Sequence, residues 1–253
     1  MIEKGIKNLD SLKDYYDFSK LEIIRIQKDN INDLSVLTYF RNLYNLKILD
    51  LEENKLTEDN SKVFAELDAP NLEFLDLFGN YFTTFDTFKY LNRFPKLTKF
   101  FFGNNLINDH NWDEEYDCST IKEIGLSIGV FSEESIKRLS KFKLNNLQIL
   151  YLSGNNIHSL NFLKDIKCEK LEEIWLMNNY IEDFGQLVKL KNLKIINLKN
   201  NKIKDISKLD EFVKEFKELK KLIISKNKID TKDEKNIQII ENIRNKNIQI
   251  DIL

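Results

Sequence analysis

The sequence predicts an α/β solenoid, an elongated domain in which short repeats stack on one another. An eleven-position phrase, L-x-x-L-x-L-x-x-N-x-I with Ile allowed for Leu, recurs along the chain and is clearest between Leu147 and Asp205. Its four apolar positions are apolar in all nine repeats, although the whole chain is only 42% hydrophobic. A repeat of this length cannot bury its apolar face alone, so neighbouring repeats share one continuous core.

The register of the phrase is unbroken and divides the chain. The nine repeats begin at Leu21, Leu46, Leu72, Leu97, Ile121, Leu147, Leu171, Leu193 and Leu219. We therefore expect one domain with nine repeats in residues 21–230, an N-terminal helical cap in 1–20 and a C-terminal cap in 231–253. Thr231 and Glu234 have capping-box spacing ahead of a helix. The alternation of Ile248, Ile250 and Ile252 then predicts a terminal strand.

The ninth position of the phrase favours Asn, and we call these residues the Asn ladder. A short amide that points inward can satisfy backbone groups where the chain bends out of a strand. Asp29 and Gly129 are the exceptions, and Gly129 predicts an irregular turn in the fifth repeat. The ladder comprises Asn54, Asn80, Asn105, Asn155, Asn179, Asn201 and Asn227.

These motifs resemble the intracellular leucine-rich repeat family. Short repeats such as NNKIKDISKL are similar to its SDS22-like subclass, whereas longer repeats carry helical spacing on their outer side, as in Phe85, Phe88 and Leu91. The resemblance is to a mixture of the two kinds, and no single member is identified. It implies a curved, horseshoe-shaped solenoid with about ten parallel strands on its inner, concave side and an outer arc of short helices and 3-10 turns.

Alternation along each inner strand then exposes positions three, five and seven. Large apolar groups and acids at these positions are candidate contacts for a partner, because exposed aromatic and Met side chains are typical of interface cores. The fifth-position column ends at Ile223 and Ile252. The predicted partner-binding residues are Phe74, Asp76, Phe78, Phe101, Gly125, Tyr151, Trp175, Met177, Asp50 and Glu52.

Two hypotheses concern the centre and the ends of this face. Gly125 would leave a shallow pit between Phe101 and Tyr151, into which a partner inserts a side chain. Alternatively, the aromatic residues only stiffen the sheet and the glycine only marks a distorted repeat. The acids at one end, and Lys199, Lys221 and Lys226 at the other, are either complementary patches or plain solvated surface.

Catalytic and metal-binding patterns are missing from the sequence. His110 and His158 have neither metal spacing nor a nucleophile beside them. The acidic segment Asp109–Asp117, with Trp112 and Tyr116, lacks the glycine of a calcium loop and is a second candidate contact surface. We expect no cofactor and no metal, and we expect Cys118 and Cys168 to be reduced thiols.

The leading expectation is a non-catalytic protein-protein interaction module, acting as a regulatory or scaffold subunit; an SDS22-like phosphatase regulator is one version. The alternative is a bacterial effector or a toxin-inhibiting immunity protein, and an enzyme is the third class. A net charge of −2 argues against nucleic acid. Without a leader or a long apolar run, we expect a monomer that does not bind membranes and stays in the cytoplasm or, in a eukaryote, the nucleus.

Overall fold

The structure is a computed structural model that describes residues 17–39, 43–108, 115–129 and 133–252. It consists of two compact units, Met1–Gly129 with Lys141–Lys143, and Val130–Ser140 with Leu144–Leu253. Each unit is described by itself, so the expectation of a single domain stays a prediction. The predicted N-terminal cap helix lies outside the described residues, apart from a 3-10 turn, η2 (Phe18–Lys20).

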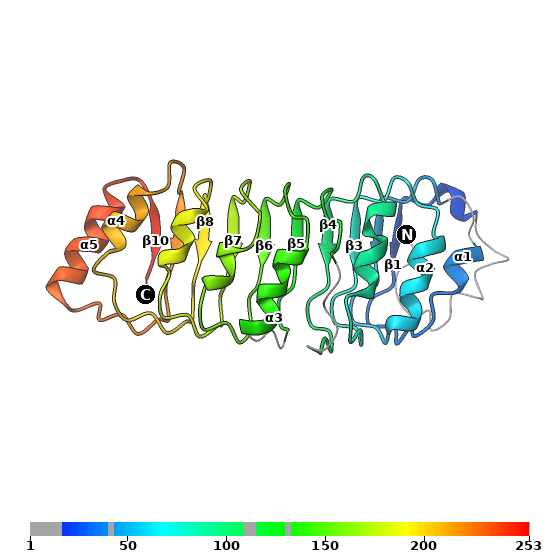
Figure 1. The fold of residues 1–253 in the computed structure, drawn as a ribbon, viewed down its shortest axis with the longest axis horizontal. Helices are drawn as coiled ribbons and strands as arrows, with labels where there is room; N and C mark the ends of the chain where they lie inside the picture. Colours follow the sequence, from blue (N-terminus) through cyan, green and yellow to red (C-terminus); the bar gives the residue numbers. More distant parts are fainter. Residues whose placement is uncertain (1–16, 40–42, 109–114, 130–132, 253) are drawn as a thin grey trace. The chain divides into compact units, whose positions relative to one another are not determined.

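The first unit contains five parallel strands, each paired with the next in chain order (Figure 1). They are β1 (Ile23–Arg25), β2 (Ile48–Asp50), β3 (Phe74–Asp76), β4 (Lys99–Phe101) and β5 (Glu123–Gly125). The segments between them form α1 (Val36–Tyr39), η3 (Glu58–Asn60), α2 (Ser61–Glu66) and η4 (Asp86–Arg93). The helical spacing of Phe85, Phe88 and Leu91 thus produces a 3-10 helix.

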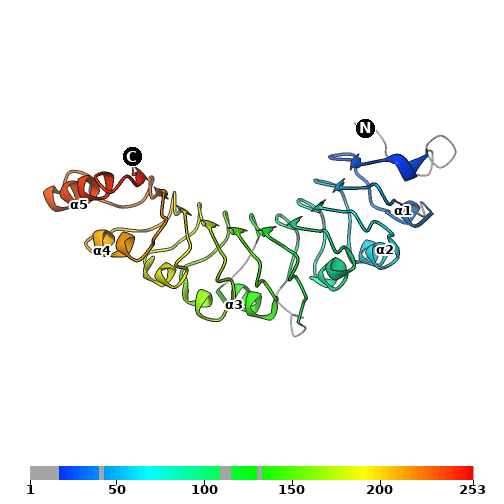
Figure 2. The ribbon, with the colours of Figure 1, turned by 90° about the horizontal axis from the view of Figure 1, so that it is seen from above.

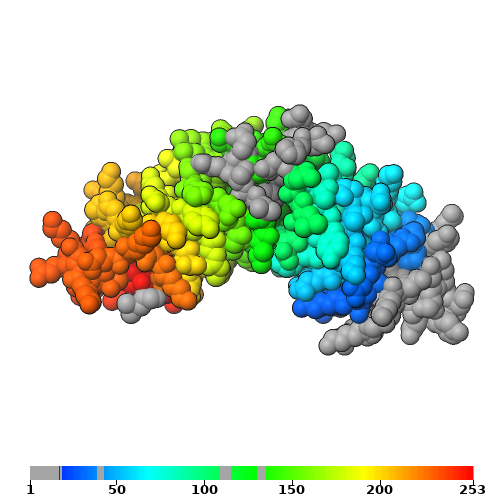
Figure 3. All heavy atoms as spheres, turned by 90° about the horizontal axis from the view of Figure 1, so that it is seen from below, coloured from blue at the N-terminus to red at the C-terminus, as the bar shows by residue number. Residues whose placement is uncertain are grey.

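The second unit repeats this plan with five more parallel strands. They are β6 (Ile149–Tyr151), β7 (Glu173–Trp175), β8 (Ile195–Asn197), β9 (Lys221–Ile223) and β10 (Gln249–Asp251). Its helical segments are α3 (Glu133–Lys137), η5 (Arg138–Lys141), η6 (Asn161–Lys164), η7 (Gly185–Lys189), α4 (Leu209–Lys214) and α5 (Glu234–Arg244). The residues of α5, coloured orange in Figure 3, lie at the surface at the C-terminal end of this unit.

Within each unit the strands lie on one face and the helical segments on the other (Figure 2). The core fills the space between them. It is built from the fourth and sixth positions of the repeat, such as Leu75 and Leu77, and from apolar residues of the helical side, such as Phe88 and Phe212. The predicted fold class, a repeat solenoid with ten parallel strands, is confirmed.

The Asn ladder ties adjacent repeats together. The Asn179 amide donates to the carbonyls of Leu152 and Leu176, both at 3.0 Å, and its Oδ1 accepts the N–H of Ile157 at 3.2 Å. Asn80 and Asn201 form the equivalent set of bonds in their own repeats. Each such amide satisfies backbone groups that burial would otherwise leave unpaired.

The eighth position of the repeat has a left-handed backbone, a feature that the sequence analysis missed. The φ angles at this position lie between 52° and 70°. Gly and Asn adopt this conformation at little cost, and they hold five of the nine positions, which is the signal that could have revealed it. The residues are Lys28, Glu53, Gly79, Asn104, Ile128, Gly154, Asn178, Asn200 and Lys226.

Two details that the sequence analysis predicted for the C-terminal cap are wrong. The cap of α5 is Asp233, whose carboxylate accepts the N–H groups of Lys235 and Asn236, so the Thr231–Glu234 capping box does not form. In β10, Asp251 is the partner of Ile223, so Ile252 falls one position beyond the fifth column and is buried. The strand predicted around Ile250 is confirmed.

The predicted irregular turn at Gly129 stays a prediction, because residues 130–132, which follow it, lie outside the described residues. His110, Trp112 and most of the Asp109–Asp117 segment lie outside them too. Tyr116 is only 3% exposed, and its ring packs edge-on against Phe142 with centroids 5.1 Å apart. Tyr116 is therefore a core residue and not part of a contact surface.

Candidate functional site

The strand face of the second unit carries a pair of stacked aromatic rings. Tyr151 of β6 and Trp175 of β7 are register partners, with centroids 5.9 Å apart and planes 29° from parallel. The indole N–H of Trp175 donates to Glu173 at 3.1 Å. Both rings are partly exposed. We call these two residues the aromatic pair, and they form a rigid, half-buried apolar surface of the kind that anchors protein partners.

Met177 extends the aromatic pair along the same strand. It is partly exposed two residues after Trp175, and its sulfur lies 4.0 Å from the Asn197 amide of the next strand. A thioether beside aromatic rings adapts to the shape of a partner because it is unbranched and polarisable. The three predicted site residues of this unit are therefore brought together on one surface.

The strand face of the first unit carries carboxylates that are only partly neutralised. Asp50, Glu52 and Asp76, which we call the carboxylate patch, lie on and just after β2 and β3. Gln27 donates to Asp50 at 2.8 Å and to Glu52 at 2.9 Å, and the Arg25 Nε lies 3.6 Å from Asp50. The patch thus includes a network within the protein itself, which sequence reasoning did not predict.

The pKa of Asp76 is raised to about 7. Burial is the largest cause, a 2.8 Å hydrogen bond from the Phe78 N–H lowers the pKa, and the neighbouring charges of Asp50 and Glu52 raise it. Burial is also the main cause that raises the pKa of Glu52. An acid with a pKa near neutrality changes its charge in the physiological range. The charge of this patch therefore depends on pH and on the approach of a cation.

The predicted pit at Gly125 is filled on the side of the first unit. A Cβ placed at Gly125 would lie 2.3 Å from Cδ1 of Phe101, so the Phe101 ring itself occupies the space over the glycine. The same ring packs against Phe74 with centroids 5.6 Å apart. Phe74, Phe78 and Phe101 are partly exposed, and Gly125 is buried. The glycine makes room for a neighbouring ring of its own chain.

Alternation along the strands holds only in part. At the fifth position Asp76, Phe101, Tyr151 and Trp175 are partly exposed, as predicted, whereas Asp50, Gly125, Asn197 and Ile223 are buried. Periodicity assigns a side chain to a face of the sheet, but its neighbours on that face decide how much solvent reaches it. Among the predicted basic residues, Lys199 and Lys221 are partly exposed and Lys226 is exposed.

Other reactive groups lie away from these surfaces. Cys118 and Cys168 are free and buried, and burial raises the pKa of their thiols to about 12 and about 11. His158 is exposed and stacks on Tyr180 with centroids 5.0 Å apart. Among the residues that the structure describes, no three His, Cys, Asp or Glu side chains are grouped so as to hold a metal ion.

The helices of the described part of the chain are all too short or too polar to cross a membrane.

Comparison with family models gives matches to leucine-rich repeats along both units. The model described as "Leucine rich repeat" matches residues 19–82, and that described as "Leucine Rich repeats (2 copies)" matches residues 145–189 and 169–211. The solved structures of internalin C2 and an internalin (inlF), both from Listeria monocytogenes, align with TM-scores of 0.53 and 0.50 at 19% and 15% identity. They cover 94% and 93% of this chain, and 83% of each internalin chain. At these identities the likeness concerns the fold.

Two curated relatives are similar in sequence. "Protein PAC2" of Saccharomyces cerevisiae is 32% identical over 188 residues, which are 73% of this chain and 30% of the relative. "Tubulin-specific chaperone E" of Dictyostelium discoideum is 24% identical over 90% of this chain and 54% of its own length. The chain thus spans about a third to a half of the length of these relatives.

Proposed function

Because this chain belongs to the leucine-rich repeat family, we propose that it is a non-catalytic protein-binding module and that the strand face of its second unit binds the partner. The aromatic pair is the observation that carries this proposal. The rings of Tyr151 and Trp175 and the side chain of Met177 are partly exposed on the strand face of this unit. Exposed apolar surface of this kind marks interaction sites in soluble proteins.

We further propose a tubulin subunit as the first partner to test. One relative, aligned over 90% of this chain, is named a tubulin-specific chaperone. Both relatives come from eukaryotes, which favours a partner of this kind over the bacterial effector or immunity alternative. The regulatory or scaffold role, the monomeric state and the location in the cell stay predictions.

The direct experiment compares the affinity of tubulin for the unmodified chain and for Trp175→Ala, by surface plasmon resonance. Trp and Tyr at the centre of an interface commonly contribute 2 kcal/mol or more, so we expect the dissociation constant to rise by about thirtyfold. Tyr81→Ala is the matched control, because Tyr81 is 46% exposed but lies outside the strands. It should leave the affinity unchanged.

Two results would overturn the proposal in different ways. If tubulin binds the unmodified chain and Trp175→Ala equally well, the strand face of the second unit is not the binding surface. If neither binds while both remain folded by circular dichroism, tubulin is the wrong partner.

A further inference from the structure

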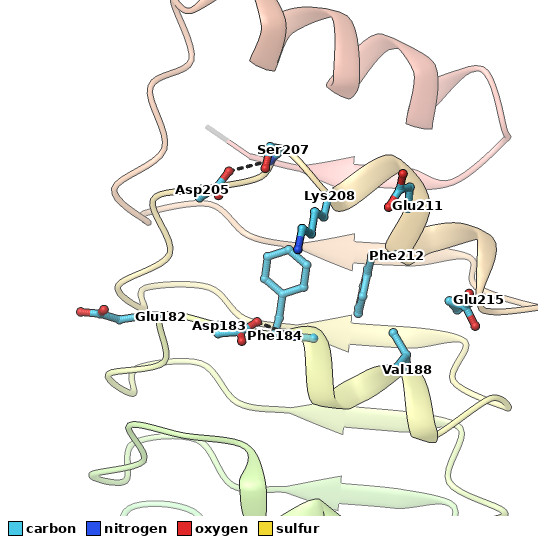
Figure 4. A pocket seen from close by; sticks show the side chains of 11 residues that line it. Glu182, Asp183, Phe184, Val188, Asp205, Ser207, Lys208, Glu211, Phe212 and Glu215 are labelled. Atoms are coloured by element: carbon cyan, nitrogen blue, oxygen red, sulfur yellow. Dashed lines mark hydrogen bonds between the residues drawn. The ribbon is translucent and has the colours of Figure 1, made fainter.

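A groove lies on the helical side of the second unit, between η7 and α4. Its volume is about 570 Å³. Phe184 and Phe212 form the apolar floor together with Val188, and the two rings meet edge to face with centroids 4.8 Å apart. Figure 4 shows Glu182 and Glu215 on opposite sides of these rings. A space of this size holds a few side chains of a ligand.

The rim of the groove is strongly acidic. Five carboxylates line it, with Lys208 as the one cationic side chain among its lining residues. Asp183 and Asp205 each accept the N–H of the residue two positions later, at 2.8 Å, and so hold the two turns. Glu215 pairs with Lys191. Glu182 and Glu211 are exposed and project from the rim.

A smaller depression of about 360 Å³ shares Glu182 and Asp183 with the groove and continues it along the repeats. The stacked rings of His158 and Tyr180 border it. The Tyr180 ring already accepts one cationic side chain of the protein itself, because the Lys202 ammonium lies 5.6 Å from its centroid. The surface therefore combines apolar floor, aromatic ring faces and anionic rim over adjacent repeats.

We propose that this groove docks a basic amphipathic segment of a protein partner. Leucine-like side chains, or the stems of lysine and arginine, lie over Phe184 and Phe212, and their cationic heads meet Glu182 and Glu211. An acidic segment is repelled by the rim, and a purely ionic ligand gains nothing from the floor. The site is on the opposite face from the aromatic pair and stands independently of the function proposed above.

The test uses the full chain and a short fluorescein-labelled peptide in which arginine alternates with leucine. We expect saturable binding, seen by fluorescence anisotropy, that weakens as salt is added. A peptide with citrulline in place of arginine keeps the shape but loses the charge, and it should bind more weakly. The backbone amide signals of Gly185 and Ser207 should shift in NMR spectra during the titration.

The decisive variant is Glu182→Gln with Glu211→Gln, since neither carboxylate holds a turn. Loss of two exposed charge pairs should weaken peptide binding by about two- to thirtyfold. Asp165→Asn with Glu169→Gln removes two exposed carboxylates of the same unit outside the groove and should leave the affinity unchanged.

The proposal is overturned if both double variants weaken binding equally, if the citrulline peptide binds as well, or if the peptide does not bind. Trp175→Ala separates the two proposals. It should weaken the binding of tubulin at the strand face by about thirtyfold and leave peptide binding in the groove intact, so either site can fail without the other.

Discussion

Single amides of the Asn ladder hold this fold at the scale of individual residues. Asn179→Ala removes buried bonds to two backbone carbonyls and one backbone N–H, together with a longer, part-buried bond to the Met177 carbonyl. Because each unsatisfied buried group costs about 1–3 kcal/mol, we expect the free energy of unfolding to fall by about 3 kcal/mol or more. Urea denaturation measures it. Asn156→Ala, at an exposed position, should change stability by less than about 0.5 kcal/mol, and an equal loss in both variants would contradict the ladder's role.

Ile128 is the one β-branched residue among the left-handed eighth positions, with φ of 57°. Its side chain is 55% exposed, so replacing it sacrifices little packing. Asn tolerates this conformation, and Ile128→Asn should stabilise the protein by about 1 kcal/mol. Leu106→Asn is the control, because Leu106 is 57% exposed and has an ordinary backbone. Thermal unfolding that shows no gain for Ile128→Asn over this control would argue against strain at Ile128.

At the residue scale, some side-chain roles could be predicted from the sequence and others could not. The Asn ladder could be predicted because one column requires one side-chain chemistry. The position of the Phe101 ring over Gly125 could not, because a rotamer depends on the space left by neighbours in other repeats. The sequence also could not show that Asp233 and not Thr231 caps α5, because both are good capping residues and they lie only two positions apart.

At the scale of strands, the carboxylate patch couples stability to pH. The folded pKa of Asp76 is about 7, above its ordinary value of 3.8, so the folded state binds the extra proton between these values. Stability from this group is therefore fully present below about pH 4 and is lost as pH rises through 7. Between pH 5 and pH 8 the free energy of unfolding of the unmodified protein should therefore fall by on the order of 2 kcal/mol more than that of Asp76→Asn, which has no carboxyl group to ionise.

Urea titrations of both proteins at the two pH values measure this difference. The Asn side chain still offers an oxygen to the Phe78 N–H, so the turn after β3 is kept. An Asp76→Asn variant whose stability follows pH as the unmodified protein does would show that Asp76 stays ionised in the folded state.

The elements themselves were largely predictable, because burial forces the same apolar columns in every repeat. The strands and the helical side followed from those columns. What the pattern did not distinguish is α-helix from 3-10 helix, as in η4 and η7, because both place residues three apart on one face. It also did not reveal the groove, whose floor is made by residues that the pattern assigns to the core, such as Phe184 and Phe212.

On the scale of the whole molecule, we propose that two kinds of surface bind two kinds of ligand. The strand face offers rigid aromatic area, and the helical side of the second unit offers an acidic groove. The chain spans about a third to a half of its curated relatives, so a partner that those longer proteins bind can meet this region together with others. The identity of that partner was beyond the sequence pattern, which specifies the scaffold and leaves exposed positions free.

The most direct test of the central claim places a probe on the aromatic pair. The chain has two tryptophans, Trp112 and Trp175, so a Trp112→Phe variant labelled with 5-fluorotryptophan carries a single fluorine at Trp175. We expect its fluorine NMR signal to shift or broaden saturably as unlabelled tubulin is added, and to stay unchanged with serum albumin. Tubulin binding that leaves this signal unchanged would contradict the account.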